Sequence, residues 1–214
     1  MPTDNDSVGL VRKIRMRRAV LQFVAPAKVF DAFCGLTGEM YRSVWKDAAE
    51  YVGCDYKWET NDTRRRFVAK NQRVMRAIDL TQYNVFDFDA YGTPWDQLWI
   101  LLHRRRWIPG ELGAVILTVG MGLQLNLKRN VPKAQCDLLG IVAGKKLPPI
   151  GRSPHLSITA IERWAKFARV KIEHKWFSRA SGSGALVEYH AVVFRGCKYE
   201  ACQVTLSPDR GGSA

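Results

Sequence analysis

The sequence lacks any apolar run long enough to cross a bilayer. Nowhere in the 214 residues does a stretch reach the length of a spanning helix, which needs roughly 18 uninterrupted apolar residues. The first residues carry Asp4 and Asp6 and lack the apolar segment of a secretory signal. We therefore expect a protein that is neither membrane-embedded nor secreted, and a cytoplasmic location.

Metal-binding and disulfide patterns are also missing. The five cysteines form an odd set without a CxxC pair, which argues against a disulfide framework and against a four-thiolate zinc site. The four histidines lack metal-ligand spacing, so no metal is expected. The residues concerned are Cys34, Cys54, Cys136, Cys197 and Cys202, and His103, His155, His174 and His190. A reducing compartment fits this set best.

Acidic residues are few beside the basic ones. There are 20 Asp and Glu against 33 Lys and Arg, and the formal net charge is +13. The basic residues gather at positions 12–18, 64–66, 104–106, 128–129 and 145–146. Each cluster by itself is most simply a solvated helix face or helix end. The summed excess nevertheless favours a phosphate-rich partner, because phosphate contacts dominate nucleic-acid binding.

The length suits one α/β domain with one sizeable core. We expect a basic N-terminal segment at 1–27, a single domain at 28–206 and a flexible tail at 207–214. A long, basic and irregular stretch at 120–156 is the candidate substrate-binding insertion. Its candidate nucleic-acid contacts are Lys128, Arg129, Lys145, Lys146 and Arg152.

Short apolar runs alternate with helical patterns along most of the chain. The runs predict buried parallel strands at 28–33, 51–55, 74–78, 85–89 and 114–119. Helices are expected after Gly38, after the caps Asn61 and Asp62, from Thr93 to near Gly110, and from a Thr159–Glu162 capping box. Two β-like runs, 170–177 and 186–194, flank a Gly/Ser turn and predict a hairpin.

This order of elements predicts a mostly parallel sheet with helices on both faces. In such a sheet, ligands bind at the carboxyl ends of the strands, near the point where the strand order reverses. Three aspartates lie at predicted strand ends: Asp55, Asp79 and Asp89. The first strand runs into the turn Asp31-Ala-Phe-Cys-Gly-Leu-Thr-Gly38. The glycines there let backbone approach a ligand.

With these residues the sequence resembles the class I S-adenosylmethionine (SAM) dependent methyltransferases. The resemblance covers roughly residues 20 to 195 and implies a Rossmann-like α/β fold with a seven-stranded, mostly parallel sheet. It implies SAM as cofactor, with Asp31, Phe33, Gly35 and Gly38 in the turn that contacts its methionine part. Asp55 then accepts hydrogen bonds from the ribose hydroxyls, and Asp79 and Leu80 fall at the adenine contacts.

The segment Asp89-Ala-Tyr-Gly-Thr-Pro94 carries the most specific part of the resemblance. It is similar to the D/N-P-P-Y/F signature of amino-methyltransferases, and is closest to the version in tRNA guanine-N2 dimethyltransferases. The resemblance implies that Asp89 contacts the cofactor and holds an exocyclic amine, while Tyr91 stacks on the base. The implied activity is methyl transfer to an exocyclic amine of a base in RNA or DNA, with catalysis largely by positioning. A flipped or single-stranded base is required.

Ala90 is a departure, because the family usually has proline there. Alanine leaves the turn freer, which favours an alternative: a nucleic-acid-binding or interaction protein that kept the fold and lost catalysis. A methyltransferase for small molecules or proteins with an incidental basic surface is a further alternative. Cys34 suggests the cytosine-C5 enzymes, but their nucleophile follows a proline after the fourth strand, where this chain has Ala90-Tyr91. That mechanism is disfavoured.

Overall fold

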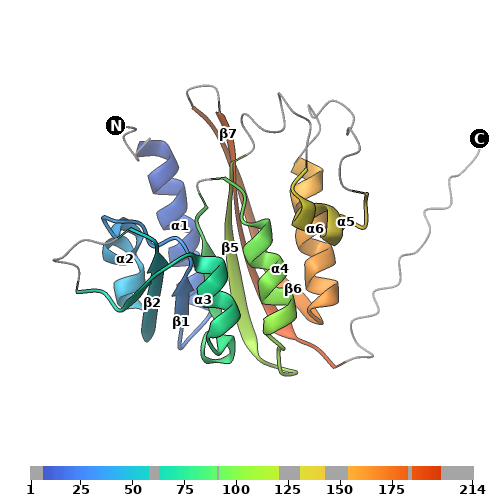
Figure 1. The fold of residues 1–214 in the computed structure, drawn as a ribbon, viewed down its shortest axis with the longest axis horizontal. Coiled ribbons are helices and arrows are strands. Elements are labelled where there is room, and N and C mark those ends of the chain that lie inside the picture. The colour runs from blue at the N-terminus through green and yellow to red at the C-terminus, as the bar shows by residue number, and fades with distance from the viewer. Residues whose placement is uncertain are drawn as a thin grey trace, which may run out of the picture.

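The described part of the chain is built around a seven-stranded sheet (Figure 1). The computed structural model describes residues 7–57, 63–90, 92–120, 131–142, 154–182 and 185–198. The strands are β1 (Lys28–Asp31), β2 (Glu50–Asp55), β3 (Arg66–Val68), β4 (Val85–Phe88), β5 (Leu112–Gly120), β6 (Val170–Gly182) and β7 (Ala185–Gly196). Their order across the sheet is β3-β2-β1-β4-β5-β7-β6. β1 to β5 are parallel, and β7 is antiparallel to β5 and β6. The predicted fold class is confirmed.

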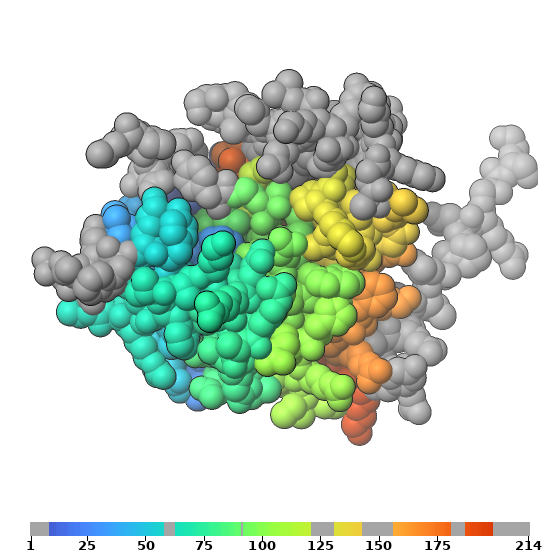
Figure 2. Space-filling model, in the orientation of Figure 1, coloured from blue at the N-terminus to red at the C-terminus, as the bar shows by residue number. Residues whose placement is uncertain are grey.

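Helices cover both faces of this sheet. They are α1 (Ser7–Phe23), α2 (Glu39–Ser43), α3 (Asn71–Ala77), α4 (Trp95–Arg104), α5 (Lys133–Leu139) and α6 (Pro154–Phe167), with 3-10 turns η1 (Trp45–Asp47) and η2 (Leu80–Gln82). α1 and α2 pack on one face, where Val20 and Met40 join a cluster with Val29 and Ile116. α3 to α6 pack on the other, and Figure 2 shows them side by side.

The predicted strands at 28–33, 51–55, 85–89 and 114–119 are present as β1, β2, β4 and β5. The central ones read as unbroken apolar runs because helices bury both of their faces. β4 is buried at every position, and β5 is buried from Gly113 to Val119. The predicted hairpin is also present, as β6 and β7.

The third predicted strand and the helix before it are wrong, and their order is the reverse of the prediction. Residues 66–68 form β3, which pairs with β2 from Gly53 to Asp55. Residues 74–78, predicted as a strand, belong mostly to α3. There Val74 and Met75 are buried while Arg76 is exposed, which is a helical pattern. Periodicity alone cannot separate so short an apolar run from a buried helix segment.

Two predictions after β5 are also wrong. The stretch 120–156 is not wholly irregular, because α5 lies within it and buries Leu138 and Leu139 against the core. α6 begins at Pro154, so Thr159 lies inside the helix and does not cap it. Proline suits the first helical position, because its missing N–H would be unpaired there anyway.

The predicted basic segment at 1–27 contains a helix that belongs to the core. Met16 and Val20 of α1, and Val24 directly after it, are buried against the sheet. The helix therefore packs as an integral layer of the fold, although the proposed boundary at residue 28 remains a prediction. None of the helices in the described ranges is long and apolar enough to span a membrane.

Candidate functional site

The candidate site lies at the carboxyl edge of the parallel strands, where the strand order reverses between β1 and β4. β1 pairs with β2 on one side and with β4 on the other. The strands that follow β1 are therefore added first on one side of it and then on the opposite side. Asp31 ends β1, Asp55 ends β2, and Asp89 directly follows β4. Three of the predicted site residues are thus brought to one edge.

The turn after β1 is shaped by Asp31 and two glycines. Phe33 N donates to Asp31 Oδ1 at 3.1 Å, which folds the chain back over the strand end. Gly35 and Gly38 have φ of 64° and 63°, in the left-handed region that favours glycine. A Cβ added at Gly35 would meet no atom within 4 Å, so the backbone there borders open space. This is the geometry a ligand-approaching turn requires.

Asp55 is hydrogen-bonded to the same turn. Its Oδ2 accepts from Gly35 N at 3.1 Å, and its Oδ1 accepts from Lys57 N at 3.0 Å. An ionised carboxylate has about four acceptor positions, so Asp55 keeps capacity for further donors such as two hydroxyls. The side chain is only partly buried, which leaves it accessible. The ribose contact that the resemblance implies for Asp55 stays a prediction.

Arg64 holds the other side of this turn, a role that sequence reasoning missed. Its guanidinium donates to the carbonyl oxygens of Cys34, Gly35 and Leu36, each at 3.0 Å. A Cβ added at Gly38 would lie 2.3 Å from Arg64 Nη1, so Gly38 must stay glycine for this contact. In the sequence Arg64 was visible only as one member of a basic cluster.

A buried charge cluster lies beneath the site, on the α1 face. Arg17 is 1% exposed and donates from Nε and Nη2 to the two oxygens of Asp87, at 2.6 and 2.7 Å. Trp45 Nε1 adds a third bond to Asp87 at 2.8 Å. The planar fork of an arginine suits such a bidentate pair. The cluster therefore anchors α1 to β4.

Asp31 is a buried carboxyl beside the negative charge of Asp87. Burial raises its pKa well above the ordinary value, and the charge of Asp87 raises it further. Arg17 offsets only part of this, because it is already committed to Asp87. Tyr51 Oη lies 3.0 Å from Asp31 Oδ2, and Asp31 Oδ1 accepts the Phe33 amide. Burial also raises the pKa of Asp87, although the charge and hydrogen bonds of Arg17 counter part of that effect.

Asp89, the predicted catalytic residue, is held by two cations of α1. Its Oδ1 lies 2.9 Å from Lys13 Nζ, and its Oδ2 lies 3.2 Å from Arg17 Nη2. Burial alone would raise the pKa of Asp89, but the charges of Arg17 and Lys13, together with side-chain hydrogen bonds, hold the pKa below the ordinary value. Asp89 is therefore ionised and acceptor-only. Its side chain is 11% exposed and that of Lys13 25%, so Lys13 is the more movable partner.

The loop after Asp89 packs tightly against the end of β5. Ala90 is buried, and its N–H donates to Phe88 O at 2.9 Å. Gly120 N donates to Gly92 O at 2.6 Å, and a Cβ on Gly120 would lie 3.0 Å from that oxygen. The structure thus restrains this loop by hydrogen bonds where the family uses proline. The predicted base-stacking residue, Tyr91, lies outside the described residues.

Asp79 and Leu80 do not lie at this edge, so their predicted adenine contacts are wrong. They follow α3 and precede β4, which places them at the amino edge of the sheet. The exposed Asp79 caps η2 by accepting from Thr81 N at 2.9 Å, and Leu80 is buried in the core. The error follows from the misplaced third strand. Ala69 and Lys70 follow β3, and Asn71 then begins α3.

Asn71 links the carboxyl edge to α4. Its Nδ2 donates to Ala32 O at 2.9 Å, and its Oδ1 accepts from Gln97 Nε2 at 2.9 Å. Gln97 is buried, and its Oε1 is without a hydrogen-bond partner among the described residues. No sequence pattern pointed to this pair.

Cys34 lies in the turn but is no nucleophile. Burial raises the pKa of its thiol to about 12, and Asp31 adds to this effect. Since only a thiolate attacks, the cytosine-C5 mechanism stays disfavoured. Nowhere in the described ranges do three His, Cys, Asp or Glu side chains gather as a possible metal site.

The predicted nucleic-acid contacts lie outside the described residues, namely Lys128, Arg129, Lys145, Lys146 and Arg152. Among the other basic clusters, two arginines serve the fold. Arg17 is buried in the charge cluster, and the buried Arg105 pairs with Glu111. Each is paired with a carboxylate, so these pairs leave the net positive excess unchanged, and Arg15 and Arg18 of α1 remain exposed.

No protein-family model and no curated protein matches the sequence. Solved structures are nevertheless similar in fold. TYW2 of M. jannaschii in complex with AdoMet has a TM-score of 0.53 and 10% identity, covering 91% of this chain and 79% of that one. Trm1 of Pyrococcus horikoshii with SAM has a TM-score of 0.56 and 15% identity, covering 90% of this chain and 56% of that one.

This chain therefore spans a little over half of the Trm1 chain. At these identities the likeness concerns the fold, whose strand order and terminal hairpin agree with the sequence-based expectation. The chain has the Rossmann-like fold of the class I SAM-dependent methyltransferases.

Proposed function

We propose that this chain is a SAM-dependent N-methyltransferase acting on an exocyclic amine of a base in RNA or DNA. One observation carries the proposal: Asp31 with its glycine turn, Asp55 and Asp89 share the carboxyl edge at the strand-order reversal. The fold is shared with two structures solved with SAM. SAM, when bound, supplies an electrophilic methyl group.

The residues of the chain divide the work between cofactor and substrate. The backbone at Gly35, which borders open space, and the free acceptor capacity of Asp55 suit the cofactor. Arg64 keeps that turn in place by holding its carbonyl oxygens. Asp89, as an acceptor, holds the target amine, and Tyr91 stacks on the base. The nitrogen lone pair is then directed at the methyl carbon, so that rate comes from positioning.

The nucleic-acid substrate is supported by the motif at Asp89 and by the net charge of +13. A second candidate is a nucleic-acid-binding protein with impaired catalysis. Ala90 favours it, and so does the engagement of both Asp89 oxygens by Lys13 and Arg17. A transfer assay with radiolabelled SAM against tRNA, rRNA, single-stranded DNA and duplex DNA separates the two. Binding without transfer to any of them supports the second candidate.

SAM and its demethylated product are expected to bind the purified protein, and Asp55→Ala is expected to weaken both. The loss follows because alanine removes the acceptor for the ribose hydroxyls and the Gly35 N–H partner. Isothermal titration measures it, and about a tenfold or larger change is expected because hydrogen bonds to a charged group contribute roughly 1.5–3 kcal/mol. Asp79→Ala, at the opposite edge, is the matched control and should titrate like wild type. If neither ligand gives a binding heat or raises the unfolding temperature, the assignment of SAM as cofactor is wrong.

Affinity for nucleic acid is expected to fall steeply with salt, because displaced counterions drive such binding. Neutralising Lys128, Arg129, Lys145 and Lys146 together should lower affinity across sequences and flatten the salt dependence by up to about four counterions. Fluorescence anisotropy with a labelled single strand measures this between about 50 and 200 mM salt. Over that range, proteins with many phosphate contacts lose affinity by a factor of about 10³ to 10⁵. Neutralising the exposed Lys166 of α6 and Lys171 of β6 is the control. Binding that ignores salt contradicts the assignment.

A further inference from the structure

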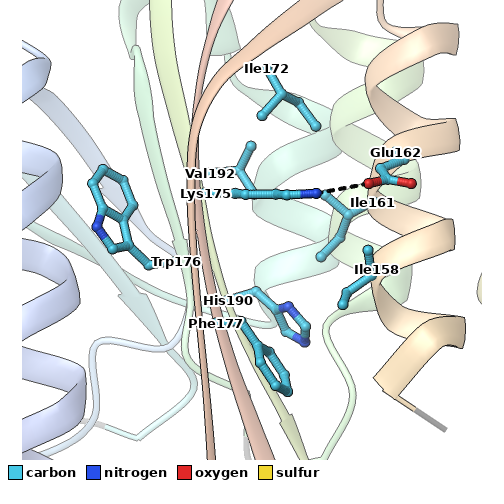
Figure 3. A pocket seen from close by; sticks show the side chains of 9 residues that line it. All are labelled: Ile158, Ile161, Glu162, Ile172, Lys175, Trp176, Phe177, His190 and Val192. Carbon is cyan, nitrogen blue, oxygen red and sulfur yellow. Dashed lines mark hydrogen bonds and ion pairs between the residues drawn. The ribbon is translucent and has the colours of Figure 1, made fainter. Parts of the chain in front are cut away.

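A pocket of about 200 Å³ lies between α6 and the outer strand β6, apart from the site at β1 and β4 (Figure 3). Ile158 and Ile161 of α6, Val192 of β7 and Phe177 of β6 form its apolar walls. Phe177 is 45% exposed. An ion pair between Lys175 and Glu162, 3.1 Å long, connects β6 to α6 beside the pocket. Both side chains are exposed, so this pair opens at little cost.

One buried polar side chain, His190, also lines this pocket. It is 3% exposed, and its ring centroid lies 5.0 Å from that of Phe177. Its Nε2 lies 3.3 Å from Glu188 Oε2. Glu188 is fully buried, and its Oε1 accepts from Arg179 Nη2 at 2.8 Å.

The Glu188 contact decides which nitrogen of His190 carries hydrogen. Burial alone would raise the pKa of Glu188, but the bonds from His190 and Arg179 outweigh it and lower the pKa. An ionised carboxylate only accepts, so Nε2 must be the donor. In the neutral ring Nδ1 is then an acceptor, and no hydrogen bond joins it to another residue within the described ranges. The pocket thus offers one buried acceptor among apolar walls.

The volume of the pocket limits the size of the ligand that can reach this acceptor. A cavity of about 150 Å³ in another protein holds benzene, so about 200 Å³ suits one six-membered ring with small substituents and is tight for a purine. Apolar walls with one directional polar group are typical of small-ligand sites. The ligand must be flat, to lie against Phe177, and must present an N–H to Nδ1.

We propose that this pocket binds a pyrimidine base, with its N–H donating to His190 Nδ1 and its face against Phe177. The choice of a nucleobase among flat donors rests on the proposed nucleic-acid function. The base belongs either to a single strand or to a free nucleoside, since the recognising chemistry is the same. This site is separate from the one for the methylated base, because β5 and β7 lie between β4 and β6.

Titration with uridine and with 3-methyluridine tests the proposal, because the second lacks the N3–H donor. NMR signals of the His190 ring are expected to shift with uridine, and 3-methyluridine is expected to bind about fivefold to tenfold more weakly. His190→Phe should remove the preference between the two ligands. His174→Phe is the matched control, because His174 is exposed and stacks on Trp176, on the α1 face. Oligouridine RNA is the second arm: tighter binding than uridine assigns the site to a strand, and equal binding assigns it to the free nucleoside.

Uridine that leaves the His190 signals unchanged at millimolar concentration overturns the proposal. So does equal binding of uridine and 3-methyluridine to the wild type. Ile158→Trp, which fills the pocket without touching the Glu188 contact, covers the case in which His190→Phe does not fold, and it should abolish uridine binding. None of these readouts needs methyl transfer or SAM. If the protein binds SAM but not uridine, that result contradicts the proposal for this pocket and leaves the proposed methyltransferase function untouched.

Discussion

The Asp89→Asn variant is expected to bind SAM as the wild type does and to lose methyl transfer by several orders of magnitude. Asparagine keeps the shape of Asp89 but replaces one acceptor by a donor, so the amine of the target base loses part of its hold. Effective molarities for well-positioned groups correspond to roughly 7 to 11 kcal/mol, and much of this depends on the hold on the amine. Single-turnover transfer on the best substrate measures the loss, and isothermal titration measures the retained binding.

The control for this variant is Asp96→Asn, which changes an exposed carboxylate in the first turn of α4. It should transfer at the wild-type rate. Because Asp89 also pairs with Lys13 and Arg17, thermal unfolding of Asp89→Asn must be measured as well. Near-wild-type turnover by Asp89→Asn would place the catalytic centre elsewhere. Equal losses of folding and transfer would make Asp89 a structural residue.

Arg17→Met is expected to cost about 3–5 kcal/mol of the free energy of unfolding, the range for removing one partner of a buried ion pair. Methionine fills part of the space but leaves Asp87 buried with Trp45 Nε1 as its remaining donor in the cluster. Of its two cation partners, Asp89 would keep Lys13. Because whole domains are stable by only about 5–15 kcal/mol, this is a large fraction. Urea unfolding followed by circular dichroism measures it.

Arg15→Met, on the exposed side of the same helix, is the control and should stay within about 0.5 kcal/mol of wild type. Arg17→Lys should fall between the two, since an ammonium keeps the charge but cannot donate from two sites in one plane. If Arg17→Met unfolds at the wild-type urea concentration, the bidentate pair with Asp87 does not contribute to stability, and α1 is held by its apolar side chains alone.

The strand-end aspartates show which parts of the site a sequence can predict. Asp31, Asp55 and Asp89 follow apolar runs that helices bury on both faces, so their places at the carboxyl edge follow from local pattern. The prediction for Asp79 was wrong because the local pattern before it is ambiguous. The run 74–78 is short enough to be strand or helix, and pairing of residues 66–68 with β2 decided between them. Because this one element was predicted wrongly, Asp79 and Leu80 were expected at the carboxyl edge, but they lie at the amino edge.

The sequence by itself determined the sheet class, the central strands, the terminal hairpin and the carboxylates at strand ends, because each depends on hydrophobic period or on turn residues a few positions apart. Only the tertiary structure decided what those carboxylates touch. Arg17 meets Asp87 across 70 positions of sequence, and Arg64 reaches Cys34 across 30. His190 and Ile158 likewise meet only when β7 packs against α6. Such contacts depend on how the layers pack, and the local hydrophobic pattern carries no information about a partner so far away along the chain.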